Sequence, residues 1–361
     1  MPFARLPLRL CTVALALAAF NGAAAQPPPF PGAAAHYRSW TLAHLQGSPE
    51  GLAIDAQGRL FTALSDTGEI LRLAPDGHYT HVATIPSAQL GRAGHTWGLE
   101  FDSQGYLYAA YVWTSKFYDE NDPLHLACRD STDQYTGIYR IDVRNGSVAP
   151  VLTKRDGWPV CFPDDIAIDS HGNLYVTDLT LSGIWKIAPD HSFKLWSAHA
   201  LLQWPADPYN AVPEGANDLA LDPAGQNLYV VTDGDPALLR IPIRADGSAG
   251  TPVVVARDLS PLDGVALDPA GNIYVSEILR SEISVFSPDG AERIVIATAQ
   301  TAPLVNPTSL IYHDGTVCAA NLGWNVTPEP RSVTCISGFR RPRTPAPAPA
   351  PASPPDGRPA Q

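Results

Sequence analysis

The feature that most constrains this chain is a short unit that occurs six times along it. The clearest copy is Leu262–Glu277, in which a polar residue and Gly precede an apolar triplet, a turn and a second apolar run that ends in an acid. The turn around Asp268 and Gly271 has the composition of a tight reversal, and the runs on either side are typical of β-strands. The unit therefore predicts an antiparallel hairpin in which Asp263 and Glu277 lie at the same end, where we expect the chemistry.

The other copies are spaced as the blades of a β-propeller are, mostly at intervals of roughly 40 to 50 residues. Each copy is followed by one or two further alternating runs. The other copies begin at Pro49, Thr96, Pro163, Ala216 and, in a degraded form, Pro307. Six copies of about four strands predict an all-β fold, a six-bladed β-propeller with four-stranded blades.

The last blade lacks one strand of its own. It supplies Ser309–Tyr312, Thr316–Ala320 and Ser332–Ser337 before the chain becomes rich in Pro and Ala. The one strand without a blade is Tyr37–Leu45, near the N-terminus. Because pairing these ends also removes an open sheet edge, we predict that the N-terminal strand closes the propeller by completing blade 6.

The ends of the chain have compositions unlike the repeats. Residues 1–25 contain basic residues, the apolar run Leu10–Phe20 and an A-x-A sequence, as a secretory signal peptide does, and the apolar run is too short to span a bilayer. A Pro/Ala-rich lead over 26–36 precedes the propeller at 37–340, and a Pro/Ala-rich tail at 341–361 is predicted to be disordered. We therefore expect an exported protein, periplasmic or secreted.

The charge of the chain limits its partners. The formal net charge is −12, and loss of the signal segment, which has Arg but no acid, makes it more negative. Negative charge disfavours binding to nucleic acid or to anionic lipid. We expect a monomer that acts on a small-molecule substrate, without a nucleic-acid partner or stable membrane association.

Four cysteines remain beyond the signal segment, and in an exported chain an even number predicts disulfides. Cys318 and Cys335 fall in consecutive strands of blade 6. Cys128 falls in an insertion in blade 2 and Cys161 just before blade 3, both at the face that holds the polar residues preceding each first strand. We predict the pairs Cys318–Cys335 and Cys128–Cys161. The insertion, Trp113–Tyr135, is either a packed decoration or a functional lid.

One position per blade, two residues before the first apolar residue of the unit, is expected to form a ring at one channel mouth. The ring residues are Glu50, Trp97, Asp164, Asn217, Asp263 and, with a weaker match, Thr308. Three carboxylates and a carboxamide would repel one another without a cation, and such oxygen ligands suit Ca²⁺ or another divalent cation. Asp and Asn also precede strands for local backbone bonding, so both interpretations stay open. Trp97 in the ring and His95 beside it are candidate substrate contacts, with a structural role for His95 as the alternative.

The six copies, together with Glu50 in blade 1, Asn217 in blade 4 and Asp263-Gly264 in blade 5, resemble the senescence marker protein/gluconolactonase family, which includes luciferin-regenerating enzymes. The resemblance covers about residues 37–338. It implies a six-bladed propeller in which Glu50, Asn217 and Asp263 bind one divalent cation, usually Ca²⁺, with Asp164 where the family usually has Asn. It also implies hydrolysis of lactones or related esters, with Asp263 as the catalytic residue that orients or deprotonates the attacking water.

Two functions from different classes follow. The first is an exported, Ca²⁺-dependent lactonase or esterase in which the ion polarises the carbonyl group. The sequence has no G-x-S-x-G motif, which disfavours an esterase of the α/β-hydrolase type. The alternative is a non-catalytic propeller, with repeats like those of NHL proteins, that binds a ligand or a protein on its top face.

Overall fold

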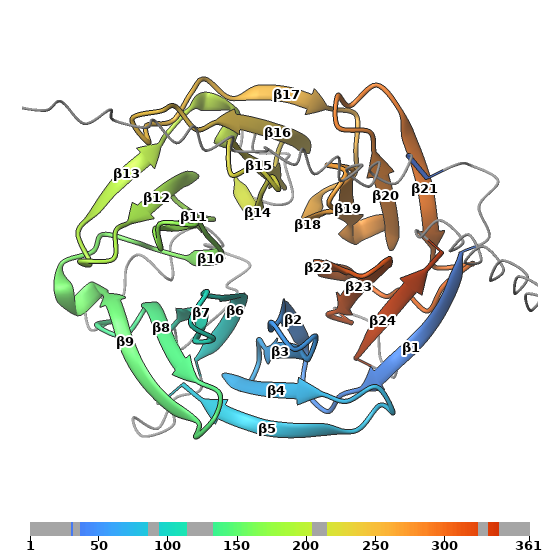
Figure 1. The fold of residues 1–361 in the computed structure, drawn as a ribbon, viewed down its shortest axis with the longest axis horizontal. Coiled ribbons are helices and arrows are strands. Elements are labelled where there is room, and N and C mark those ends of the chain that lie inside the picture. The colour runs from blue at the N-terminus through green and yellow to red at the C-terminus, as the bar shows by residue number, and fades with distance from the viewer. Residues whose placement is uncertain are drawn as a thin grey trace, which may run out of the picture.

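Six four-stranded antiparallel sheets are arranged around a central channel in the computed structural model of the chain (Figure 1). The structure describes residues 30–31, 37–85, 94–113, 133–203, 215–323 and 331–338. The predicted signal peptide, most of the lead, the tail and Cys128 lie outside these residues. The all-β, six-bladed prediction is confirmed.

Within each blade the chain runs outward from the channel, so that the first strand of each unit lies innermost (Figure 1). Blades 1 to 3 consist of β2 (Pro49–Ile54), β3 (Leu60–Leu64), β4 (Glu69–Leu73) and β5 (Tyr79–Thr84); β6 (His95–Phe101), β7 (Leu107–Val112), β8 (Gly137–Asp142) and β9 (Ser147–Thr153); and β10 (Pro163–Ile168), β11 (Leu174–Asp178), β12 (Gly183–Ile187) and β13 (Phe193–Ser197). Blades 4 to 6 consist of β14 (Ala216–Leu221), β15 (Asn227–Thr232), β16 (Ala237–Pro242) and β17 (Val253–Ala256); β18 (Leu262–Leu267), β19 (Ile273–Glu277), β20 (Glu282–Phe286) and β21 (Arg293–Thr298); and β22 (Pro307–His313), β23 (Thr316–Asn321), β24 (Ser332–Ser337) and β1 (Arg38–His44).

Short 3₁₀ helices join some of the strands, at η2 (Lys154–Asp156), η3 (Ala200–Leu202) and η4 (Ile278–Arg280). None of the helices in the described part of the chain has the length and apolar content of a membrane span.

The N-terminal strand closes the propeller, as predicted. β1 pairs antiparallel with β24, from Arg38 opposite Ser337 to His44 opposite Ser332. Blade 6 thus contains strands from both ends of the domain, which removes the open edge that β24 would otherwise present.

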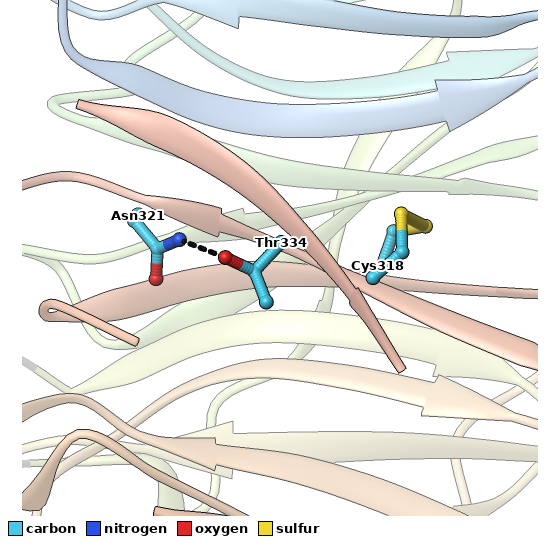
Figure 2. The surroundings of a disulfide bond; sticks show 4 residues. Cys318, Asn321 and Thr334 are labelled. Carbon is cyan, nitrogen blue, oxygen red and sulfur yellow. Dashed lines mark hydrogen bonds between the residues drawn. A yellow bond between two sulfur atoms is a disulfide. The ribbon is translucent and has the colours of Figure 1, made fainter. Parts of the chain in front are cut away.

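The predicted disulfide in blade 6 is also confirmed. Cys318 in β23 lies directly opposite Cys335 in β24, and their sulfur atoms are bonded (Figure 2). On the same two strands, the Asn321 amide donates to Thr334 Oγ1 at 2.9 Å. Cys161 is disulfide-bonded, and its predicted pairing with Cys128, outside the described residues, stays a prediction.

The inner hairpins turn as their sequence indicates. In blade 5, Asp268 Oδ1 accepts hydrogen bonds from the backbone N–H groups of Ala270 and Asn272, and Gly271 has a φ of 83°, which favours glycine. The corresponding aspartates of the other turns accept the same kind of backbone bond: Asp55, Asp102, Asp169 and Asp222. These residues therefore shape the hairpins, at the end away from the ring.

The hydrophobic core is divided among the blade interfaces. One cluster joins blades 2 and 3 through side chains such as Ile138 and Val176, and another joins blades 5 and 6 through Val285 and Val317. The other four interfaces of the described structure have corresponding clusters. Each blade therefore buries its apolar faces only when both neighbours are present.

Candidate functional site

The ring residues are positioned by an irregularity that all six inner strands share. In blade 3, Pro163 pairs with Asp178 and Ile166 with Val176, so two residues, Asp164 and Asp165, stand opposite one. The pairing of the first two strands shifts at the corresponding place in every other blade. Such a bulge takes residues out of the ladder and re-aims their side chains, here at the mouth of the channel.

The structure brings three predicted carboxylates together in this ring. Glu50, Asp164 and Asp263 are at most 8% exposed. Burial, and then the negative charges of Asp164, Asp263 and Asp165, raise the pKa of Glu50 well above its usual value. Glu50 Oε2 is buried, and no described residue forms a hydrogen bond with it. A buried oxygen of this kind among like charges needs a proton or a cation.

The fourth predicted oxygen donor, Asn217, is held by a side chain of its own blade. Its amide Nδ2 donates to Asp233 Oδ2 at 3.3 Å, and both side chains are buried. Because the nitrogen of the carboxamide is engaged, its oxygen is the atom left to act as an acceptor or a ligand.

The other two ring positions make contacts between neighbouring blades. Thr308 Oγ1 donates to the backbone oxygen of Glu50 at 3.3 Å, which joins blade 6 to blade 1. Trp97 is buried against Phe162, with ring centroids 5.3 Å apart, in the core between blades 2 and 3.

His95 starts the inner strand of blade 2 at the same end as the ring. Its ring centroid is 6.3 Å from that of Trp97, and its Nδ1 is 2.5 Å from the backbone oxygen of Ser65. Since a carbonyl oxygen only accepts, Nδ1 carries the proton. Burial lowers the pKa of His95, against the opposing effects of the Ser65 carbonyl and Asp66, which favours the neutral ring.

Glu277 is not part of the ring, although it lies at the same end of its hairpin as Asp263. It is fully buried and accepts hydrogen bonds from Ser260 N and Ser284 Oγ, both at 3.1 Å. Arg280 and Arg293 form ion pairs with the two carboxylate oxygens. Glu277 is therefore a neutralised structural acid that anchors the chain before β18.

A second layer of acids, which the sequence reasoning missed, lies next to the ring. Asp165 and Asp218 are buried and form a hydrogen bond with each other, so the pair shares a proton. Burial raises the pKa of Asp165 to about 6, and burial followed by the charge of Asp165 raises that of Asp218 well above its usual value. Each also accepts a backbone N–H of the next blade at 3.1 Å, from Leu219 and Val265 respectively.

Glycine makes room for this layer. A Cβ atom on Gly98 would lie 2.2 Å from Asp165 Oδ1 and 2.7 Å from the backbone oxygen of Asp164. Gly51 and Gly264 approach the next inner strand in the same way. The sequence did contain a signal for Asp165 and Asp218. The residue after the ring position is Gly in three blades but Asp in blades 3 and 4.

Glu100 is the other acid that was missed. Burial, and then the charge of Asp165, raise its pKa to about 8. Its signal was a break in the repeat, because four other blades have alanine at this position. These alanines are Ala53, Ala167, Ala220 and Ala266.

The ring fits a hard divalent cation only if the amide takes part. No group of three or more His, Cys, Asp or Glu side chains among the described residues is arranged to hold a metal ion. With Glu50 and Asp263 as two ligands, Asn217 would have to supply a third oxygen, which is the ligand type that Ca²⁺ accepts. The unpartnered Oε2 of Glu50 is the observation that favours a cation at this place.

The fold and the ring define a class of protein, the six-bladed β-propeller with a buried acidic centre at one channel mouth. Within that class, residues 132–315, just over half of the chain, match the model of the SMP-30/gluconolactonase/LRE-like region, and the chain belongs to this family. A shorter segment, residues 41–73, matches the N-terminal part of strictosidine synthase-like proteins. No curated protein matches the chain by sequence.

Solved structures share the architecture at low sequence identity. A gluconolactonase from Xanthomonas campestris is 17% identical with a TM-score of 0.61, over 83% of this chain and 89% of that one. A luciferin-regenerating enzyme is 13% identical with a TM-score of 0.60, over 84% and 96%. The PQQ-bound aldose sugar dehydrogenase from Streptomyces coelicolor is 16% identical with a TM-score of 0.57, over 86% and 99%. At these identities the likeness shows the fold alone.

Proposed function

We propose that this protein is an exported hydrolase of a lactone or a related ester that depends on a divalent cation, Ca²⁺ being the best fit. The observation that carries the proposal is the Glu50 carboxyl group, which is buried beside Asp164 and Asp263 with one oxygen that no described residue bonds. Membership of a family that includes gluconolactonases supports the reaction class. The similar structure of a gluconolactonase supports a small-molecule substrate.

The residues that would hold the cation are Glu50, Asn217 and Asp263, with Asp164 beside them. A cation bound there would supply a Lewis acid for the carbonyl oxygen of the substrate. Asn217 is suited to its role because Asp233 fixes its amide nitrogen.

The proton transfer is assigned to Asp263. Its carboxylate comes from an inner strand whose backbone is fixed by the bulge of blade 5, where Gly264 N donates to Ser276 Oγ at 2.6 Å. A carboxylate held in this way orients the attacking water and accepts its proton. Trp97 and His95 lie on the blade 2 side of the same mouth, where they would contact the substrate.

The test combines metal analysis, calorimetry and a panel of lactones. Chelation of the purified protein should remove one tightly bound divalent cation together with lactonase activity, and Ca²⁺ should restore both. Asp263→Asn should keep metal yet lose turnover, whereas Glu50→Gln should mainly weaken metal binding. Glu292→Gln, which changes an exposed acid, serves as the matched control.

One result would overturn this function. If the protein carries no metal and Ca²⁺ leaves its melting temperature unchanged, the enzyme interpretation fails. The non-catalytic propeller that binds a partner on this face would then replace it.

A further inference from the structure

The channel contains a cavity of about 260 Å³ that the proposed reaction does not use. It is lined by inner-strand residues that follow the ring in sequence, toward the opposite end of the channel. Most of the lining is aliphatic, from residues such as Leu52, Leu99, Ile166, Leu219, Val265 and Leu310. The connections from first to second strand at this end are all within the described residues.

The polar side chains that line the cavity are mostly acids. Asp165 and Asp218 lie next to the ring and are already bonded to each other and to backbone N–H groups. The hydroxyl-bearing side chains Ser309 and Tyr312 complete the polar lining. No Lys, Arg or His is among the residues that line this cavity.

Glu100 differs from the other two acids because no described residue bonds its carboxyl group. It lines the cavity, and no hydrogen bond or ion pair to its carboxyl group comes from any described residue. Alanine occupies the same position in four other blades, so an acid is not required by the repeat. Glu100 is half-buried, so its carboxyl group loses part of its hydration without a partner among the described residues to replace it.

The chemistry of the lining selects one class of ligand. An anion would meet three acids, and a neutral molecule could bond Glu100 but would not compensate its negative charge when it is ionised. A hard metal ion needs several charged or oxygen ligands in a suitable arrangement, and no group of three or more His, Cys, Asp or Glu side chains among the described residues is arranged to hold one. A short alkylammonium ion satisfies both features, because its charged end pairs with the carboxylate while its chain covers apolar surface.

We propose that this cavity is a binding site for a small aliphatic ammonium ion, with Glu100 as its anionic partner. The site is separate from the ring, since Asp165 and Asp218 lie between the two. The proposal does not depend on lactonase activity or on a metal in the ring.

The experiment uses n-butylammonium as the probe and n-butanol as its neutral counterpart, with the full-length protein in calorimetric titrations. Butylammonium should bind at least tenfold more tightly than butanol, and it should raise the melting temperature progressively with the logarithm of its concentration above the Kd. Glu100→Gln should abolish that preference, whereas Glu292→Gln should leave it unchanged.

Binding should also depend on pH. Burial and Asp165 hold the pKa of Glu100 at about 8, so the ligand must displace a proton, and affinity should increase from pH 6.5 to 8.5 while the amine stays protonated. Asp165, Asp218 and Tyr312 face the same cavity, and Glu100→Gln isolates the contribution of Glu100 from theirs. Equal affinity for butanol and butylammonium, or unchanged binding in Glu100→Gln, would overturn the proposal. The wild-type comparison of the two probes gives this answer even if the variant folds poorly.

Discussion

The carboxyl groups on the inner strands lie close together in a largely buried environment, which raises the pKa of several of them. Six of them face one channel in the described structure, and four have pKa values raised mainly by burial. The six acids are Glu50, Glu100, Asp164, Asp165, Asp218 and Asp263. A buried acid whose pKa is raised favours the folded state only while it keeps its proton, so the metal-free protein is sensitive to alkaline pH.

Glu100 provides a direct test of this sensitivity. Its pKa is about 8 in the folded protein and about 4.3 in an unfolded chain, so the folded state binds the extra proton between these values. Stability should be greatest below the lower value and should fall by up to about 1.4 kcal/mol per pH unit as pH rises toward the higher one. Glu100→Gln should flatten the decline of melting temperature between pH 5 and 8, measured with chelator present. Parallel curves for wild type and variant would show that Glu100 is not the group responsible.

Gly98 lies against the second acid layer, Asp165 and Asp218, where there is no room for a side chain. Gly98→Ala would place a Cβ atom 2.2 Å from Asp165 Oδ1 and 2.5 Å from its Cα atom, so we expect a loss of about 1–3 kcal/mol or more. Gly105→Ala is the comparison, because its Cβ atom would meet nothing within 4 Å and would cost mainly the strain of a left-handed residue, about 1–2 kcal/mol. Urea unfolding measures both, and a smaller loss for Gly98→Ala would contradict the packing described.

At the scale of single elements, the hairpins could be predicted but their bulges could not. Turn residues such as Asp268 and Gly271 act locally, so their sequence indicates the reversal directly. In a regular strand, neighbours such as Asp164 and Asp165 point to opposite faces. A bulge adds one residue and breaks this alternation, and the residue types at these positions do not predict it. The sequence therefore predicted a single layer of ring residues. The second layer, Asp165 and Asp218, could be recognised only from the pairing register of the first two strands in each blade.

The disulfide of blade 6 stabilises an element that is assembled from both ends of the domain. Cys318 and Cys335 are 17 residues apart, and a loop of about that length is worth about 3 kcal/mol. The double variant Cys318→Ala/Cys335→Ala should therefore melt several degrees lower than the wild type, with its metal content unchanged. Calorimetry under non-reducing conditions measures the shift, and the wild type in reductant should reproduce it. An unchanged melting temperature in both cases would show that strand pairing alone holds this blade.

At the scale of the whole molecule, closure by β1 determines whether the ring of blades is continuous. Deletion of residues 26–45 removes β1 and uncovers β24 as well as the cluster shared by blades 6 and 1. We expect a sharp fall in melting temperature and a broader transition, because each blade depends on both neighbours. Deletion of residues 342–361, an equal length of the Pro/Ala-rich tail, is the matched control and should leave the melt unchanged. A truncated protein that melts like the wild type would contradict closure.

The repeated bulge separates the scaffold from its chemistry. In every blade the residues that face the mouth stand outside the ladder of strand pairing. Their side chains can therefore differ between blades without any change in the pairing of the strands. Blade 2 with Trp97 and blade 6 with Thr308 illustrate this freedom, since they keep the shared backbone with uncharged side chains. Point substitution at these six positions can therefore change the chemical groups at the mouth while the strand pairing of the propeller stays the same.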